Sequence, residues 1–426
     1  MEIIRYPSEQ AWDALLTRST LDTARLFATV QAILDDVRLH GDEAVKRYGK
    51  QFDKADLASL AVSEAEWADA EKRLPETLKA AIRTARRNIE TFHASQRFTG
   101  VKVETTPGVT CWQKAVPIEK VGLYIPGGTA PLFSTVLMLA VPARLAGCRE
   151  IVLCTPPDAT GSVHPAILYA AREAGVSKLY KAGGVQAIAA MAYGTESIPK
   201  VYKLFGPGNQ YVMAAKQLVS LRDVAIDMPA GPSEVEVIAD DSADPRFIAA
   251  DFLSQAEHGA DSQSLLLTTS ATLVDKVVQA IDEQLQALPR REITEKSLAH
   301  SRLIVLRNDD EIVRFTNRYA PEHLIIQTKN YAALGERIEN AGSVFLGPYT
   351  PESAGDYASG TNHTLPTNGY AKAYSGVNLD SFIKKITFQE ITEQGIHNLG
   401  PVIEVMAANE QLDAHRHAVT LRLQSL

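Results

Sequence analysis

The chain has 426 residues, of which 45% are hydrophobic and 22% are charged, and its formal net charge is −8. This length favours two or three domains, and the composition is typical of a globular protein. The negative charge and the lack of a basic stripe argue against a nucleic-acid partner. Every apolar stretch of about 18 residues is interrupted, as by Pro142 and Arg144 in APLFSTVLMLAVPARLAG, so we expect no membrane association.

The cysteines and the first residues indicate the compartment. MEIIRYPSEQ lacks the apolar region of a secretory signal, and Cys111, Cys148 and Cys154 form no CxxC pair. We therefore expect a cytoplasmic protein without a disulfide framework. A thiol nucleophile is one alternative, but Cys148 and Cys154 lie at a helix end and in an apolar strand, where free cysteine is usually a core residue.

Residues 1–120 are expected to form an opening helical segment. LDTARLFATVQAILDDVRLHG has helical periodicity, and we expect this helix to end at Gly41. Ser63 and Glu66 in SEAE form a capping box, and Pro75 opens the helix PETLKAAIRTARRNIETFHASQ.

From Val121 onward, short apolar runs alternate with helical stretches, and Gly or Pro marks each junction. The runs are VGLYI, EIVLCT, KLY and VYKLF in a first series, then SEVEVIA, SLLLTT, LIVLR, HLIIQT and SVFLG in a second. This alternation predicts an α/β fold with mostly parallel sheets that are covered by helices on both faces. We expect two α/β units of similar build, over residues 121–232 and 233–380.

Residues 381–426 are expected to form a small helical tail. It is too short to bury a core of its own, so it must dock either on its own chain or on a neighbouring one.

Several polar residues are candidates for a metal site. In LSQAEHGADSQ, Gln255 and His258 lie three apart at a helix end that Gly259 stops, so both can point at one ion. Asp356 follows in a polar stretch without periodicity, and His415 lies near the end. Nitrogen and oxygen donors without sulfur suit a catalytic zinc. The alternatives are a solvated helix face for the first pair, a turn cap for Asp356 and an exposed helix residue for His415.

Glu322 and His323 stand between Pro321 and the apolar run HLIIQT. Adjacent side chains at such a junction reach one cavity only where the backbone turns, and an acid beside a histidine there often has no function. The glycine turns IPGG (Gly127, Gly128) and GPGN (Gly206 to Asn209) each follow an apolar run and precede a helix, which favours an anion. Such turns are common in α/β folds, and the usual GxGxxG fingerprint is absent.

Taken in order, the motifs from about Arg38 to the C-terminus resemble those of histidinol dehydrogenase. They are VGLYIPGGTAPLFSTVLML, GGVQAIAAMAYGTESIP, FGPGNQYV, DMPAGPSEV, LSQAEHGADSQ, YAPEHL, ESAGDYASGTNHTLPT and EQLDAHRHAVTLR. The resemblance implies oxidation of L-histidinol through L-histidinal to L-histidine with two NAD, in histidine biosynthesis, with one Zn²⁺ per subunit. It also implies two related, incomplete Rossmann-like domains, with the opening helices joined to the second. The tail would dock on the partner subunit of a homodimer with shared active sites.

The resemblance also implies roles for individual residues. His323 would take the hydroxyl proton as hydride leaves the substrate carbon, and Glu322 would activate a water that attacks the aldehyde. The zinc ligands would be Gln255, His258, Asp356 and His415, the last in the site of the partner subunit; glutamine is an unusual zinc ligand. NAD would contact Tyr124, Gln186 and Asn209. The substrate would contact Ser233, Glu410, the zinc ligands and the catalytic pair, and its amine and imidazole could bind zinc, whose role would be orientation.

Two other functions stay open. A relative with the same zinc site could oxidise another small alcohol such as a sulfonated diol, although Glu410 would repel an anion. A zinc hydrolase could use Glu322 as its base without a nicotinamide. The sequence departs from the family pattern at Gln411, where glycine is usual, and in the variable connection SVHPAILYAA.

Overall fold

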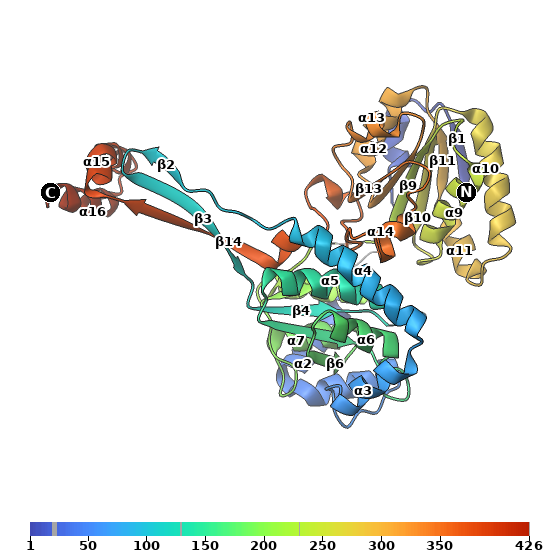
Figure 1. Cartoon of the computed structure of the whole chain (residues 1–426), viewed down its shortest axis with the longest axis horizontal. Coiled ribbons are helices and arrows are strands. Elements are labelled where there is room, and N and C mark those ends of the chain that lie inside the picture. Colours follow the sequence, from blue (N-terminus) through green and yellow to red (C-terminus); the bar gives the residue numbers. More distant parts are fainter. Residues whose placement is uncertain (19–23, 128–129, 230, 426) are drawn as a thin grey trace.

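The computed structural model of the chain describes residues 1–18, 24–127, 130–229 and 231–425. Two parallel sheets, each covered by helices, form two units, and an arm extends away from both (Figure 1). The predicted α/β class is therefore confirmed, with a small pair of helices at the end of the chain.

The first unit is built on five parallel strands in the order β6-β5-β4-β7-β8. These strands are β4 (Lys120–Tyr124), β5 (Glu150–Thr155), β6 (Lys178–Lys181), β7 (Lys203–Phe205) and β8 (Ala225–Ile226). Helices α3 (Glu64–Arg73), α4 (Glu76–Ala94), α5 (Phe133–Ala146) and α6 (Pro165–Glu173) cover one face of the sheet. Helices α2 (Ala24–Tyr48), α7 (Gly184–Tyr193) and α8 (Gln210–Ser220) cover the other. The four apolar runs of the first series form strands because both of their faces are buried.

The second unit has six parallel strands in the order β1-β11-β10-β9-β12-β13. They are β1 (Glu2–Arg5), β9 (Glu234–Ala239), β10 (Gln263–Thr268), β11 (Arg302–Val305), β12 (His323–Gln327) and β13 (Ser343–Leu346). One face packs on α9 (Pro245–Ala256), α10 (Ala271–Leu285) and α11 (Arg291–Leu298). The other packs on α1 (Trp12–Leu15), α12 (Asp309–Tyr319) and α13 (Tyr331–Gly335). Helix α14 (Glu352–Tyr357) follows β13 and contacts α9.

The opening segment divides between the two units, which corrects our expectation that its helices join the second. β1 pairs with β11, and Trp12 lies in the core of the second unit. Helices α2, α3 and α4 pack on the five-stranded sheet instead, because their apolar stripes, with Val30, Trp67 and Ile89, fill the faces of that sheet. The capping box of Ser63 and Glu66 forms as predicted.

The helix expected to end at Gly41 bends there and continues to Tyr48. Gly41 has φ 51° and ψ −132°, and a Cβ at this position would lie 2.3 Å from a carboxylate oxygen of Glu196. Glycine therefore makes a kink and a close contact here, and the chain remains helical beyond it.

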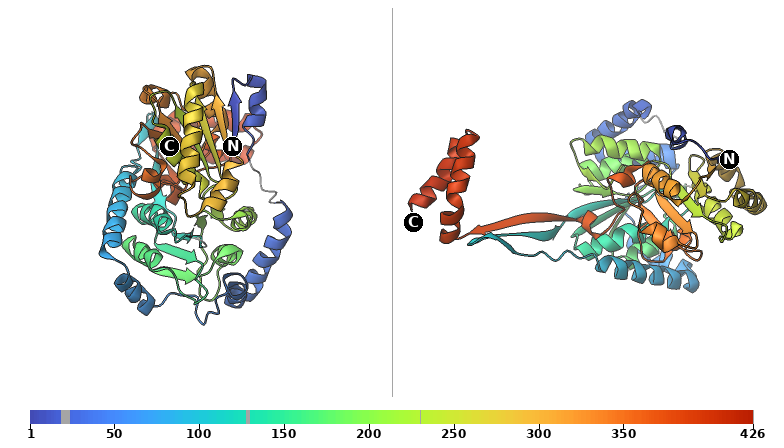
Figure 2. Two further views of the ribbon diagram at one scale, coloured as in Figure 1. Left: turned by 90° about the vertical axis from the view of Figure 1, so that its right-hand side faces the viewer. Right: turned by 90° about the horizontal axis from the view of Figure 1, so that it is seen from above.

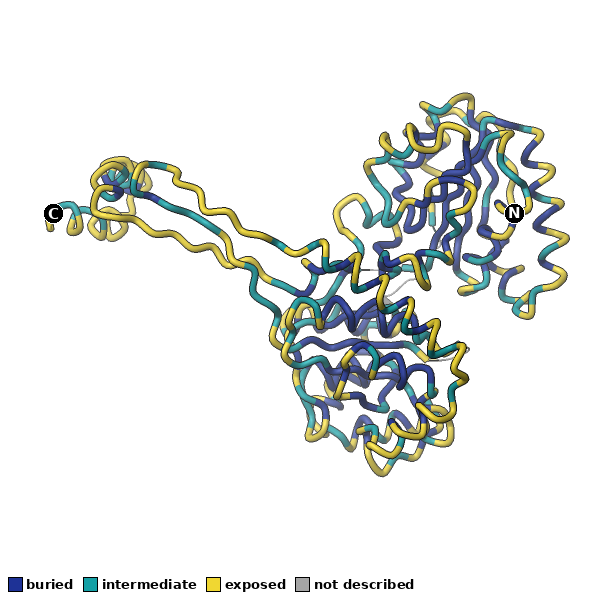
Figure 3. Tube along the Cα trace, in the orientation of Figure 1, coloured by how far each residue is buried: buried dark blue, intermediate teal, exposed yellow. Residues whose placement is uncertain are grey.

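The arm combines segments from both ends of the chain. β14 (Ile383–Ile391) pairs antiparallel with β3 (Val109–Pro117), and β3 pairs with β2 (Val103–Thr106). Two helices follow, α15 (Glu393–Asn409) and α16 (Asp413–Gln424), as predicted for the tail. The three strands were not predicted. The arm projects from the first unit and is largely exposed (Figures 2 and 3).

Among the helices in the described part of the chain, none combines the length and apolar character needed to span a bilayer. The most apolar stretch noted in the sequence forms α5, which packs inside the first unit.

A buried carboxyl group in the second sheet gives a testable pH dependence. Glu236 lies in β9 between β10 and β12, and one of its oxygens accepts a hydrogen bond from Thr316 while the other has no partner. Burial raises the pKa of Glu236 from 4.5 to about 8. The unfolded chain ionises this group at lower pH, so its ionisation favours unfolding progressively as the pH rises from about 4.5 to about 8.

We therefore expect Glu236→Gln to flatten the fall in unfolding free energy across that pH range. Urea unfolding at a series of pH values measures this. Glu283→Gln, on the exposed side of α10, is the matched control and should follow the wild type. Parallel curves for the wild type and Glu236→Gln would contradict the prediction.

Candidate active site

The end of α9 brings Gln255 and His258 together. Gln255 is buried in the last turn, and His258 follows on an exposed turn. The hydrogen-bond network assigns the amide nitrogen of Gln255 as donor to the carbonyl of Glu234 (3.1 Å) and to Oε1 of Glu352 (3.0 Å). The amide oxygen then faces Nδ1 of His258 at 3.3 Å. An amide oxygen and an imidazole nitrogen therefore converge, as the three-residue spacing predicted.

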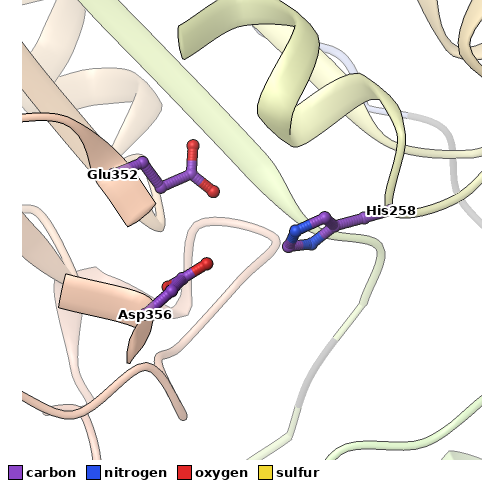
Figure 4. Close-up of side chains that lie close together, drawn as sticks. All are labelled: His258, Glu352 and Asp356. Atoms are coloured by element: carbon purple, nitrogen blue, oxygen red, sulfur yellow. The ribbon is translucent and has the colours of Figure 1, made fainter. Parts of the chain in front are cut away.

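Two carboxylates on α14 face the same point. Glu352 and Asp356 are four residues apart, and with His258 they offer ligand atoms that lie within 4.8 Å of one another (Figure 4). Asp356 was expected in an irregular loop and lies instead in the last turn of this short helix. Glu352 was not identified from the sequence, although the spacing of PESAGD places it on the helix face of Asp356.

Glu322 and His323 reach the same place because the backbone turns sharply before β12. Ala320 adopts the left-handed region (φ 55°, ψ 68°) at the end of α12. Nδ1 of His323 lies 3.1 Å from the carbonyl oxygen of Glu234, and Oε2 of Glu322 accepts from the amide of Glu234 at 2.9 Å. A carbonyl can only accept, so Nδ1 carries the hydrogen. Nε2 of His323 is left without a hydrogen-bond partner, 3.6 Å from Oδ1 of Asp356.

The electrostatics of this group are dominated by buried carboxyl groups around one imidazole. Nδ1 of His323 lies 3.6 Å from Glu322 and 3.8 Å from Glu352. Burial alone would lower the pKa of His323, but Glu352, Glu322 and Asp356 raise it well above its ordinary value. Burial raises the pKa values of Glu322 and Glu352 to about 8 each. Burial opposes ionisation of Asp356 as well, but the nearby imidazoles of His323, His363 and His258 lower its pKa.

The residues present fit a bound metal cation. The donors are nitrogen and oxygen without sulfur, which suits a catalytic zinc, and Oε2 of Glu352 is buried without a partner. Two carboxyl groups with raised pKa values ionise readily only when a cation compensates them. Gln255, His258 and Asp356 are the candidate ligands from this chain, and Glu352 lies beside them.

A partly buried arginine holds the backbone around the pair. Nε and Nη2 of Arg18 donate to the carboxylate of Glu234 at 2.6 and 2.9 Å, and Nη2 also donates to the carbonyl of Tyr319 at 2.7 Å. The start of β9 and the end of α12 are thereby tied together at the position where Glu322 and His323 follow. Ser233 immediately precedes Glu234, and its carbonyl accepts from Gln263 at 3.1 Å. Arg18 was missed from the sequence because nothing local marks it.

The three residues expected to contact NAD lie at the carboxyl edge of the five-stranded sheet. The hydroxyl of Tyr124, at the end of β4, accepts from the amide of Gly184 at 3.0 Å. Gln186, in the first turn of α7, is 1% exposed, yet neither atom of its amide has a hydrogen-bond partner. Asn209 caps α8 through Oδ1, which accepts from the amides of Tyr211 and Val212. An orphaned buried amide at this edge fits a polar ligand, because this edge is where α/β sheets bind them.

The glycine turns of this edge are close approaches of backbone to backbone. Gly206 has φ 130°, and a Cβ there would lie 2.1 Å from the carbonyl oxygen of Tyr124. A Cβ at Gly127 would lie 2.2 Å from Pro156. Gly128, the second glycine of IPGG, lies outside the described residues.

Glu410 and His415 do not join the other site residues within one chain. Glu410 ends α15 and His415 lies in α16, and both helices stand at the far end of the arm (Figure 1). Gln411 has φ 60°, which explains why glycine is usual at this position in the family. The three cysteines also lie apart from the site. Burial raises the pKa of Cys148 to about 12 and that of Cys154 further, which disfavours a thiolate in either.

Comparisons with known proteins agree with the motifs. The histidinol dehydrogenase family model matches residues 16–423. The chain is 69% identical to histidinol dehydrogenase of Bacteroides fragilis, with 100% of each chain covered. It is 52% identical to that of Escherichia coli, covering 98% of this chain and 96% of the relative. The solved structure of histidinol dehydrogenase from Elizabethkingia anophelis matches with a TM-score of 0.98 at 54% identity, covering 100% of this chain and 98% of that one. The resemblance is confirmed and begins before Arg38.

We expect the amount of bound zinc to depend on the cluster of side chains at the end of α9 and on α14. His258→Asn should lose bound zinc, and Glu352→Gln should bind it about 10- to 100-fold more weakly, because Glu352 orients Gln255. Elemental analysis and zinc titration measure this. His300→Asn, an exposed histidine, is the matched control and should keep its zinc.

Chelation should leave the far-ultraviolet circular dichroism of the wild type largely unchanged, because the hydrophobic core of the second unit keeps α9 in place without the metal. Unfolding as zinc leaves, or full zinc content in His258→Asn, would contradict the assignment.

Proposed function

The chain belongs to the histidinol dehydrogenase family, whose members are NAD-dependent oxidoreductases of an alcohol and an aldehyde, and we propose its reaction in detail. It oxidises L-histidinol through L-histidinal to L-histidine, as a cytoplasmic homodimer that uses Zn²⁺ and two NAD. The observation that supports this best is the free Nε2 of His323, which lies 3.6 Å from Asp356, on an imidazole whose Nδ1 lies 3.6 Å from Glu322. Asp356 in turn shares the candidate metal cluster with His258.

Zinc, when bound, would orient the substrate through its amine and imidazole nitrogens, which are not the reacting atoms. Gln255, His258 and Asp356 would hold it from one subunit, and His415 from the partner subunit's tail. Ser233 and Glu410 would complete the substrate contacts. NAD, when bound near Tyr124, Gln186 and Asn209, supplies the hydride acceptor for both oxidations.

His323 and Glu322 divide the proton transfers. Nε2 of His323 accepts the hydroxyl proton as the substrate carbon loses a hydride, which leaves the aldehyde. Glu322 then takes a proton from a water that adds to the aldehyde carbon. A second hydride then passes from the resulting hydrate to NAD while a hydroxyl proton passes to His323, and the carboxylic acid releases its remaining proton to give the carboxylate. Each base contributes roughly 10²- to 10⁴-fold. A bound cation would favour the unprotonated form of both groups. It would offset the carboxylates that raise the pKa of His323 and would compensate the buried charge of an ionised Glu322.

The carboxylates around the site favour a cationic substrate. Histidinol has an amine, which Glu410, Glu352 and Asp356 would attract, whereas a sulfonated diol would bring an anion toward them. The zinc hydrolase is disfavoured because the relatives are dehydrogenases.

The exposed apolar surface of the tail supports docking on a partner subunit. Val405 and Met406 in α15 are 63% and 61% exposed, and α16 buries no residue in the single chain. A partner subunit that covers these side chains would remove the apolar surface from water. The same contact would bring Glu410 and His415 to the body of that partner subunit.

The stoichiometry of NADH tests the reaction. We expect two NADH for each L-histidinol consumed, measured by absorbance against substrate loss. Glu322→Gln should slow oxidation of L-histidinal far more than oxidation of L-histidinol, whereas His323→Asn should slow the alcohol step. No NADH, or equal losses in both steps for Glu322→Gln, would overturn the proposal or the division of roles respectively.

Mixed dimers test the shared sites. A chain with His415→Asn supplies a defective tail and a sound body, and one with His258→Asn supplies the reverse. In a dimer of the two, one site receives both defects and the other neither, so two inactive variants should together regain roughly half the activity per heterodimer. Differently tagged chains allow isolation of the heterodimer. Inactive heterodimers would mean that each tail serves its own subunit.

A further inference from the structure

A partly buried carboxylate lies at the carboxyl edge of the first sheet, and the reaction above does not use it. Asp53 ends the short helical turn η2 (Gly49–Asp53) that follows α2. Its side chain packs against Gly183, the residue that precedes α7: a Cβ built on Gly183 would lie 3.1 and 3.2 Å from the two carboxylate oxygens. Asp53 is therefore in the same neighbourhood as Tyr124, Gly184 and Gln186.

The environment of Asp53 lacks the donors that a buried carboxylate needs. Oδ2 is buried and has no hydrogen-bond partner. Burial raises the pKa of Asp53 to about 6, and no cation among the described residues offsets this effect. The group is still mostly ionised above neutral pH, so its Oδ2 remains a buried acceptor without a donor. Such an acceptor is destabilising unless a ligand supplies the donor.

Gln186 is a second, independent sign of a ligand at this place. Its amide is buried, and both of its polar atoms lack partners. The two orphaned groups stand at one helix end, on either side of Gly183 and Gly184. A ligand that satisfies both must therefore present hydrogen-bond donors, such as hydroxyl groups, to Asp53. It must also present both a donor and an acceptor to the amide of Gln186.

The negative charge of Asp53 limits which part of a dinucleotide can lie there. A phosphate would be repelled, whereas the two hydroxyls of a ribose can both donate to a carboxylate. Asp53 contacts elements of the first unit, and the catalytic pair lies in the second, so the nicotinamide must point away from Asp53. The ribose beside Asp53 is then the one on the adenosine side, and NADP differs from NAD by a phosphate on that ribose.

We propose that Asp53 accepts hydrogen bonds from the adenosine ribose of NAD and excludes NADP. This rests on the proposed function of the carboxyl edge as the NAD site and adds the group that selects the cofactor. The same role belongs to an acidic residue in ordinary dinucleotide-binding folds, where it follows the second strand. Here the acid comes from a turn that precedes the whole sheet in the chain.

Equilibrium binding of NADH and NADPH to the zinc-loaded protein without histidinol tests the proposal. Measured by fluorescence titration at about pH 8, above the pKa of Asp53, the wild type should prefer NADH. Asp53→Asn should reduce that preference at least about tenfold, through weaker NADH and stronger NADPH binding. The ratio of kcat/KM for NAD and NADP should fall in parallel, while KM for L-histidinol stays unchanged. Asp56→Asn, the same change at an exposed aspartate paired with Lys50, should retain the wild-type preference.

Two outcomes would overturn the role of Asp53. Equal changes for NADH and NADPH, with a lower melting temperature, would mean that Asp53 only stabilises the N-terminus of α7. An unchanged preference would mean that it does not face the cofactor. Asp53→Ser, which removes the charge and shortens the side chain, replaces Asp53→Asn if that variant does not fold. A wild type that makes no NADH from L-histidinol would refute the proposed function itself, separately from this selectivity.

Discussion

The backbone of Glu234 is the point on which the candidate site depends. Its carbonyl fixes the tautomer of His323, its amide holds Glu322, and its side chain is held in turn by Arg18. Arg18 neutralises Glu234, but Glu322, Glu352 and Asp356 still surround one imidazole without a matching number of positive charges. Ionisation of this cluster is unfavourable in the isolated chain, and a divalent cation is the simplest group that would balance it. The fold thus places an excess of carboxyl groups at the start of β12 and the end of α9.

The two sheets could be predicted because their strands are apolar runs that are buried on both faces. Short apolar runs such as VGLYI and HLIIQT are typical of parallel strands that are buried on both faces of a sheet. The arm could not be predicted in this way. β14, IKKITFQEI, is almost entirely exposed and mixes charged with apolar residues, and it becomes a strand by pairing with β3. β1 is a short strand that is likewise mostly exposed, and its place beside β11 follows from tertiary pairing. The allocation of α2–α4 to the first sheet also depends on which faces α5–α8 leave uncovered.

The site residues also divide into those that local sequence patterns predict and those that only the tertiary structure brings together. Gln255 and His258 could be placed together from their spacing on one helix, and the family motifs marked Glu322, His323 and Asp356. Glu352 and Arg18 were not predicted. Glu352 lies four residues before the candidate ligand Asp356. Arg18 is brought to Glu234 from 216 residues earlier in the chain. Glu410 and His415 were expected in the site of a second subunit, and in the single chain they stand apart from all the others. Sequence patterns report local geometry, whereas charge compensation between distant segments appears only in the fold.

The pairing of β3 with β14 sets the order in which the molecule can be assembled. Most of the first unit can collapse once β8 has left the ribosome, because its strands are consecutive in the chain, and Val377 and Phe382 complete its core only later. The arm has to wait, since β3 remains without its main partner until β14 has been synthesised near the end of translation. β3 carries Trp112, which stacks on Phe388 of β14, so the nascent chain exposes an aromatic strand edge throughout the synthesis of the second unit. In the proposed homodimer, association of two chains through their arms would therefore be a late, post-translational event, and an unfinished chain is most open to aggregation or chaperone binding at this edge.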